Sequence, residues 1–113
     1  MREVKIGAKT YHARSLKRRE RIEHKLEDYG YGRFFYSPPE TPEGKIDRER
    51  AEKGIDLVLE LVFGRDAMSE IDEADGMNGL AAAHMGIIKE TYGAKDEEKN
   101  SPQSGAGPQT TSA

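Results

Sequence analysis

The sequence predicts a small, mainly α-helical domain of about four helices, with a β-hairpin at its N-terminus and a disordered C-terminal tail. Three observations lead to this fold class. Apolar residues recur at helical spacing in two long stretches, 46–63 and 75–92. Alternation of apolar and polar residues is confined to the beginning of the chain. Hydrophobic residues make up only 35% of the 113 residues, and charged residues another 35%, so the core is small.

The beginning of the chain has the pattern of a short hairpin. Val4–Ile6 alternates apolar and polar residues, Gly7–Lys9 supplies a turn, and Thr10–Ala13 alternates again in β-favouring residues. Two strands alone are only marginally stable in water. We therefore expect this hairpin to pack on a helix or on another subunit.

A helix is expected from Ser15, a suitable N-cap, to Tyr29, with Gly30 just past its end. Its few apolar residues fall on one narrow stripe, and most of the others are charged. The stripe consists of Leu16, Ile22, Leu26 and Tyr29.

Residues 30–44 form the next segment, where glycines and prolines make a regular helix improbable. The run Tyr31–Tyr36 within it holds four of the eight aromatic residues of the chain. One interpretation is a lid folded over a small core, because large aromatic side chains bury readily. The other is an anchor surface for a second protein, since aromatic residues and Arg are enriched in the cores of interfaces.

The apolar stretch that ends at Phe63-Gly64 predicts the most buried helix. Thr41-Pro42 has the form of a helix start, but Gly44 favours a beginning at Ile46 or Asp47. A strand over 57–63 is the competing interpretation, disfavoured because Asp56 and Glu60 are four residues apart and so fall on one polar face of a helix.

A short helix capped by Asp66 or Ser69 should follow and continue to Ala74. The last helix is then expected from Asp75 to Tyr92. His84 lies on its inner stripe, where a core histidine with satisfied hydrogen bonds is the expected role.

Residues 94–113 contain charged, amide and small residues with nothing to bury, so a disordered tail is expected there. Residues 1–93 would then be one helical domain. No run of about 18 apolar residues exists, which excludes a membrane span by sequence. The N-terminus lacks the apolar stretch of a secretion signal, so a cytoplasmic location is expected.

No motif for chemistry is found. The chain has no cysteine, and its three histidines lack the HExxH spacing that places two imidazoles on one helical face. No nucleophile elbow, P-loop or dinucleotide loop is present. We therefore expect a protein that is not an enzyme, with no catalytic residue, cofactor or metal.

Charge is distributed unevenly along the chain, with a net +5 over residues 1–36 and −8 over the rest. The basic residues of the expected helix 15–29 could neutralise phosphates, with Arg14 and Arg33 nearby. Interleaved acids and a pI of 5.7 argue against nucleic-acid binding. Head-to-tail self-association or ordinary solvated helices would produce the same asymmetry.

The order of elements resembles that of the tail assembly chaperones of long-tailed bacteriophages. These proteins tend to open with a segment like K-I-G-G-K-x-Y, which stands here as Lys5-Ile6-Gly7-Ala8-Lys9-Thr10-Tyr11. The layout continues with a charged helix, an apolar helix ending near Phe63-Gly64, an acidic short helix, and a terminal helix ending at Gly93. The resemblance covers residues 4–93, whereas the loop 30–44 has no match in the family.

This resemblance implies a protein that binds the tape measure protein and recruits tail tube subunits in the bacterial host cytoplasm. Many such genes also shift ribosomes back one nucleotide near their end. Glu98-Lys99-Asn100 can be encoded as GAA-AAA-AAC, which contains the slippery heptamer A-AAA-AAC.

Thin apolar stripes that one small domain cannot cover suggest a homo-oligomer or capture of a client helix. The expected protein-binding residues are Phe34, Phe35, Tyr36, Leu57, Leu61, Ile87 and Ile88. The ordinary interpretation of the helical members is core. The alternatives for function are a nucleic-acid-binding regulator that uses helix 15–29 and a minor structural virion protein.

Overall fold

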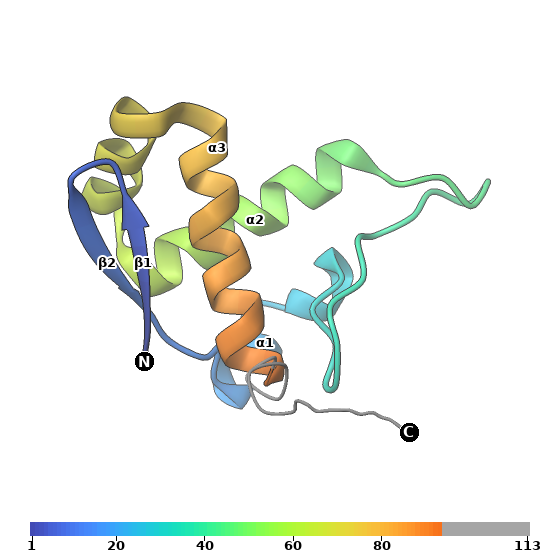
Figure 1. Ribbon diagram of the computed structural model, residues 1–113. Coiled ribbons are helices and arrows are strands. Elements are labelled where there is room, and N and C mark those ends of the chain that lie inside the picture. The colour runs from blue at the N-terminus through green and yellow to red at the C-terminus, as the bar shows by residue number, and fades with distance from the viewer. Residues whose placement is uncertain (94–113) are drawn as a thin grey trace, which may run out of the picture.

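The computed structural model describes residues 1–93, and the expected tail 94–113 lies outside the described part of the chain (Figure 1). A two-stranded hairpin precedes a group of helices, which confirms the predicted mainly helical fold class. In chain order the elements are β1 (Arg2–Ile6), β2 (Lys9–Ala13), α1 (Arg18–Glu23), the 3₁₀-helix η1 (Leu26–Tyr29), α2 (Arg48–Phe63) and α3 (Arg65–Tyr92).

The hairpin pairs β1 with β2 in antiparallel register, with Val4 opposite Tyr11 and Ile6 opposite Lys9. Its inner face packs on α3, where Ile6 and Tyr11 are buried. The two elements approach closely because α3 carries a glycine at position 86. A Cβ there would lie 2.7 Å from Cγ2 of Val4. The hairpin thus obtains from α3 the support that two strands need.

The prediction of one continuous helix over 15–29 is wrong, because α1 and η1 are two separate elements. α1 has only six residues and begins after Lys17, whose backbone N–H donates to the Glu20 carboxylate at 2.9 Å. Lys25 then adopts a left-handed conformation with φ 51°, and η1 begins at Leu26. The physical reason is burial: the turn at Lys25 places Leu26, which has no exposed surface, in the core.

The helix expected from Ile46 or Asp47 is present as α2, so the strand interpretation of 57–63 is wrong. The Asp47 carboxylate caps it by accepting from the Arg50 N–H at 3.2 Å. Gly64, with φ 89°, ends α2 and leads directly into α3. Neither Asp66 nor Ser69 is therefore an N-cap, as α3 begins at Arg65.

α3 is divided into two helical parts at Gly76, where φ 59° and ψ −142° interrupt the helical backbone. Figure 1 shows the change of direction between the yellow and orange parts of this element. The break lies next to the boundary expected between Ala74 and Asp75. Because glycine adopts positive φ without steric cost, the chain can turn there and bring the second part against the hairpin.

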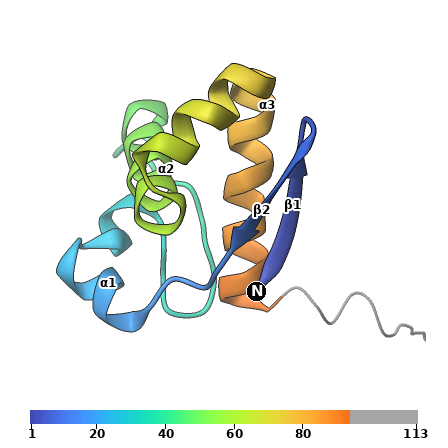
Figure 2. The same cartoon turned by 90° about the vertical axis from the view of Figure 1, so that its left-hand side faces the viewer.

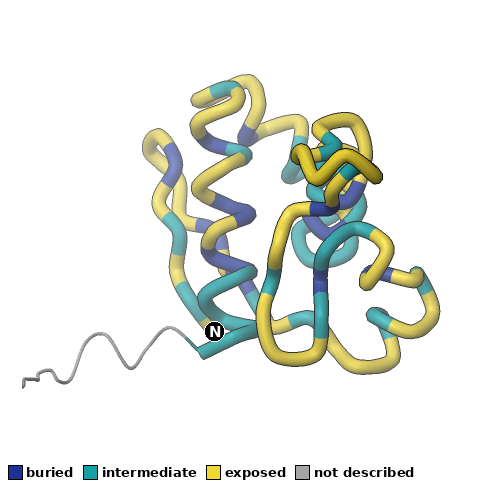
Figure 3. Tube along the Cα trace, turned by 90° about the vertical axis from the view of Figure 1, so that its right-hand side faces the viewer, coloured by how far each residue is buried: buried dark blue, intermediate teal, exposed yellow. Residues whose placement is uncertain are grey.

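The core lies where α3 meets both the hairpin and α2 (Figure 2). Buried positions recur along the side of α3 that faces these elements (Figure 3). Within residues 1–93, none of the helices is both long and apolar enough to span a bilayer. The buried hydrophobic residues are Ile6, Tyr11, Ala13, Leu26, Tyr31, Val58, Leu59, Ile71, Ala83 and Ile87.

Candidate functional site

Residues 31–36 form a tight hairpin, which we call the aromatic hairpin. Tyr31 and Tyr36 are bridged across it, the Gly32 N–H donates to the Phe35 carbonyl at 3.0 Å, and the chain reverses in between. Below the bridge, the Ser37 N–H donates to the Gly30 carbonyl at 2.9 Å. A second reversal follows, with Glu40 bridged to Ile46. The segment expected to be an irregular loop therefore contains two ordered turns.

The aromatic hairpin divides its aromatic residues between the core and the solvent. Tyr31 is 1% exposed, and Tyr36 packs on it with ring centroids 4.6 Å apart. At the tip, Phe34 is 76% exposed and Phe35 is 67% exposed. The lid interpretation describes the two tyrosines, whereas an anchor surface requires exposed aromatic residues such as the two phenylalanines.

His84 of α3 holds the base of the aromatic hairpin in place. Its Nε2 lies 2.7 Å from the Tyr31 hydroxyl, and its ring lies edge-on to both Tyr31 and Tyr36. Burial lowers the pKa of His84 to about 4, since the charged imidazolium would lose its hydration. Burial likewise raises the pKa of Tyr31. The hydrogen bond therefore joins two neutral groups at pH 7, and the expected core role of His84 is confirmed.

A second contact fixes the aromatic hairpin to the end of α3. The Tyr92 hydroxyl donates to the Gly32 carbonyl at 2.9 Å. Together with the Tyr31–His84 contact, this bond holds the adjacent residues Tyr31 and Gly32 against α3. The tip thus projects from a base that α3 keeps in position.

The other residues expected to bind protein lie on α2 and α3 and are not brought together with the tip as one exposed patch. Ile87 is fully buried. Leu57 and Ile88 pack on the core and keep part of their surface, and Leu61 is also partly exposed. The Leu61 backbone carbonyl accepts a hydrogen bond from Arg14 at 3.0 Å. Of the seven expected contact residues, only Phe34 and Phe35 are fully available to a partner.

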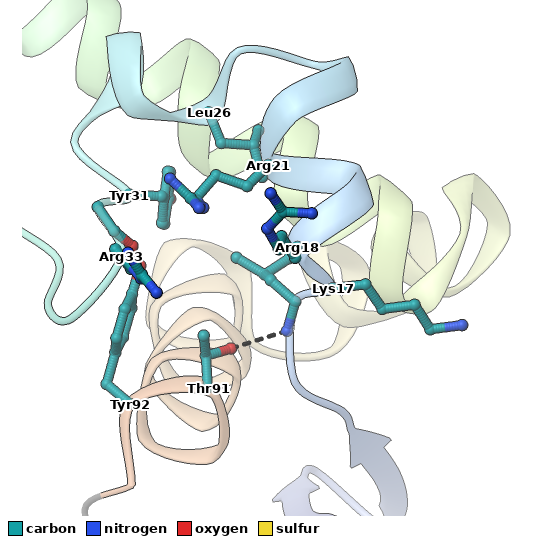
Figure 4. Close-up of a pocket in the computed structure, with 10 residues that line it drawn as sticks. Lys17, Arg18, Arg21, Leu26, Tyr31, Arg33, Thr91 and Tyr92 are labelled. Carbon is teal, nitrogen blue, oxygen red and sulfur yellow. Dashed lines mark hydrogen bonds between the residues drawn. The ribbon is translucent and has the colours of Figure 1, made fainter.

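A cavity of about 190 Å³ opens between α1, the aromatic hairpin and the end of α3 (Figure 4). Four cationic residues line it, and no carboxylate does. In Figure 4 the guanidinium groups of Arg18, Arg21 and Arg33 surround the opening, whereas the Lys17 side chain extends away from it. The lining consists of Leu16, Lys17, Arg18, Arg21, Leu26, Tyr31, Gly32, Arg33, Thr91 and Tyr92.

The walls of this cavity, which we call the arginine pocket, are held by specific contacts. The Leu16 N–H donates to the Thr91 hydroxyl at 2.9 Å and so joins the start of α1 to α3. Arg21 is bound at 2.9 Å to Glu27, a largely exposed carboxylate outside the lining. Burial raises the pKa of Tyr92, and the positive charge of Arg21 acts against this shift. The field of Arg21 therefore reaches the pocket wall.

Sequence reasoning grouped Arg14 and Arg33 with the basic residues of the expected helix 15–29, and the structure separates them. Arg33 joins the arginine pocket from the aromatic hairpin. Arg14 is held by Glu20 in two hydrogen bonds of 3.0 and 2.8 Å. Tyr92 was not expected to take part in any site. Only the folding of residues 30–36 back onto α3 brings it beside the arginines.

Over residues 1–93, no group of three or more His, Asp or Glu side chains is arranged to hold a metal ion. Comparisons of the chain with family models, with curated proteins and with solved structures find no match.

Proposed function

We propose that this protein is a non-enzymatic assembly chaperone of bacteriophage tails, which binds the tape measure protein and helps recruit tail tube subunits. The resemblance of the sequence motifs, from Lys5–Tyr11 to Phe63-Gly64 and Gly93, supports the family, and the aromatic hairpin supports protein binding. The observation that carries the proposal is the exposure of Phe34 and Phe35 on a base that His84 and Tyr92 fix in place.

The physical argument rests on preorganisation. Exposed aromatic side chains are good anchors because each offers a large apolar area and few rotatable bonds. Burying one phenylalanine fully contributes roughly 1.5–3 kcal/mol. Because the backbone of the hairpin is already ordered, binding does not have to supply the entropy of ordering it.

The partner best suited to such a tip is an amphipathic helix. A helix presents apolar side chains at positions i, i+3, i+4 and i+7, which form a continuous stripe that two adjacent aromatic residues can contact. A tape measure protein is long and rich in helices, according to the family resemblance. One such chain offers many stripes of this kind.

Self-association is a further part of the proposal. Met77 and Met85 lie eight residues apart on the second part of α3, and they are 80% and 48% exposed. The exposed Ala81 lies between them, so the three residues form one helical face. A second copy of the chain could cover it.

The alternative of a nucleic-acid-binding regulator depends on a continuous basic helix over 15–29. The break at Lys25 leaves α1 with six residues, and Arg14 and Arg21 are paired with carboxylates. These observations favour the chaperone. A minor structural virion protein is the other alternative, and it would be present in purified particles at constant stoichiometry.

The test is the double variant Phe34→Ala/Phe35→Ala. Both side chains are exposed, so the fold should be unaffected, whereas affinity for a long helical partner encoded by a neighbouring gene should fall by at least tenfold. Each tenfold loss corresponds to about 1.4 kcal/mol. The measurement is calorimetric titration of the purified partner, with circular dichroism to verify the fold.

The matched control is Ile46→Ala, since Ile46 is 57% exposed in the adjacent turn and belongs to no expected contact. It should bind as the native chain does. Equal binding by the double variant and the native chain would reject the tip as the anchor. The nucleotide sequence at codons 98–100 gives a separate check, because many genes of this family shift the reading frame near their end, and a slippery heptamer there would support the proposal.

A further inference from the structure

We propose that the arginine pocket is a binding site for a single phosphate group, carried by a small molecule or present as inorganic phosphate. Three arginine side chains line a cavity that no carboxylate lines, and Lys17 contributes to its wall while its side chain extends away from the opening. Arg33 connects this pocket to the tip of the aromatic hairpin, because its guanidinium carbon lies 5.3 Å from the centre of the Phe34 ring. The proposal does not depend on the proposed chaperone function.

The first step of the argument is the origin of the positive charges. Arg18 and Arg21 come from α1, and Arg33 comes from the aromatic hairpin (Figure 4). Three contacts of the fold bring them together. The Leu16 N–H donates to the Thr91 hydroxyl, the Tyr92 hydroxyl donates to the Gly32 carbonyl, and Tyr31 is buried in the core. The convergence therefore results from tertiary contacts and not from adjacency in sequence.

The second step is the lack of compensating negative charge. Arg21 has a partner in Glu27, but the ion pairs of residues 1–93 include none that involves Lys17, Arg18 or Arg33. Bringing like charges together is unfavourable, more so where the surroundings exclude water. An anion in the pocket removes this repulsion.

The third step is the choice of anion. Guanidinium groups present N–H donors in a planar fork that matches phosphate oxygens in pairs. Three such groups around one opening can contact several oxygens of one tetrahedral anion. Leu16, Leu26 and the rings of Tyr31 and Tyr92 supply apolar and aromatic walls beside the charges. Such walls suit the organic part of a small phosphate ester.

The fourth step excludes a nucleic-acid chain as the preferred ligand. A polymer would have to continue beyond the pocket, and the exposed surface of the neighbouring elements carries Glu23, Glu27 and Asp28. These carboxylates would repel successive phosphates. The pocket is therefore suited to one compact anion, and a polynucleotide becomes an outcome of the test.

The experiment titrates the full chain with inorganic phosphate, adenosine 5′-monophosphate and adenosine, followed by amide chemical shifts. The phosphate-containing compounds should shift the amides of Gly32, Thr91 and Arg18, and adenosine alone should not. Tighter binding of the nucleotide than of inorganic phosphate assigns the site to an ester, and equal binding assigns it to the free anion. A lack of shifts with both compounds, or shifts confined to other parts of the chain, would overturn the proposal.

Two matched variants separate the pocket from general surface charge. Arg18→Gln should weaken phosphate binding at least fivefold. Arg19→Gln removes the same charge from the neighbouring position of α1, which does not line the pocket, and should leave binding nearly unchanged. Equal loss in both variants would indicate charge attraction without a defined site and would overturn the proposal.

A single-stranded oligonucleotide of ten residues provides the last arm. If the pocket binds one phosphate, the oligonucleotide should bind with nearly the same affinity as the mononucleotide. The slope of log K against log salt concentration should then stay near the value for one phosphate contact. A steep slope that corresponds to several contacts would favour a polynucleotide and reject the compact ligand. Because neither Arg18 nor Arg19 belongs to the tip, loss of phosphate binding leaves the client-binding test unaffected.

Discussion

At the scale of single residues, the neutral state of His84 makes stability depend on pH. Its pKa is about 4 in the folded chain and 6.5 without burial, so the unfolded chain binds more protons between these values. Stability from this group is complete above pH 6.5 and is lost as pH falls toward 4. We expect a loss of about 2 kcal/mol between pH 7 and 4.5, measured by urea unfolding at each pH.

The variant His84→Gln keeps a polar partner for the Tyr31 hydroxyl and removes the titration. Its stability should change much less than that of the native chain over the same interval. Glu20 and Glu70 do not account for the loss. Their hydrogen-bonded ion pairs lower their pKa values below 4.5, so most of the stability that these carboxylates provide is lost only below pH 4.5. An unchanged pH profile in the variant would show that another group is responsible.

The residue scale also shows what the sequence could and could not predict of the candidate site. The core role of His84 followed from its position on a helical stripe. The division of the aromatic run did not, because Tyr31–Tyr36 has no helical or strand period. The five-residue separation of Tyr31 and Tyr36 is nevertheless that of a tight hairpin. The two tyrosines pair across it, and Phe34 and Phe35 lie at its exposed tip.

At the scale of elements, the contact between η1 and α2 depends on Gly54. A Cβ at this position would lie 2.5 Å from Cβ of Tyr29 and 2.9 Å from its Cγ. Alanine would favour the helix by about 1 kcal/mol in isolation. The clash requires the backbone of η1 to move, however, and overpacking of this kind costs about 1–3 kcal/mol.

We therefore expect Gly54→Ala to lower the free energy of unfolding, or at best leave it unchanged, in a chemical denaturation experiment. Lys53→Ala, at an exposed neighbouring position, serves as the control for helix propensity and should be nearly neutral. A clearly more stable Gly54→Ala variant would contradict the close packing of η1 on α2.

The elements themselves differed in how well the sequence predicted them. Asp47 and Gly93 mark helix ends through local chemistry, capping and left-handed φ, and both boundaries were predicted. A boundary was predicted between Ala74 and Asp75, close to the observed break, but the positive φ of Gly76 was not predicted. The split at Lys25 was not predicted either, because a lysine with positive φ carries no local sign of it. Tertiary burial of Leu26 imposes this conformation.

At the scale of the whole molecule, contacts between distant segments replace a large core. Glu90, near the end of α3, makes two such contacts. Its carboxylate lies 3.7 Å from Nε of Arg2, and its backbone carbonyl accepts a hydrogen bond from the Ser15 hydroxyl at 3.0 Å. The first and last described elements are thus joined. A domain of this size buries a smaller fraction of its surface than a large one and is correspondingly marginal.

Self-association is therefore expected to add stability. If the α3 face of Met77, Ala81 and Met85 pairs with a second copy, the melting temperature should rise with protein concentration, because association stabilises only the folded state. Sedimentation equilibrium should show a dimer or larger species. Met77→Lys/Met85→Lys should shift it to monomer, whereas Asn78→Lys, beside this face, should have less effect.

Salt distinguishes this association from the alternative that rests on the uneven charge of the chain. Head-to-tail pairing of the basic residues 1–36 with the acidic remainder would weaken as salt rises, because exposed charges are screened. Pairing through methionine and alanine side chains should persist from 0.05 to about 0.5 M salt, since burial of apolar area does not depend on screening. A monomer at every concentration and salt would reject both modes and leave the exposed apolar residues to a partner protein.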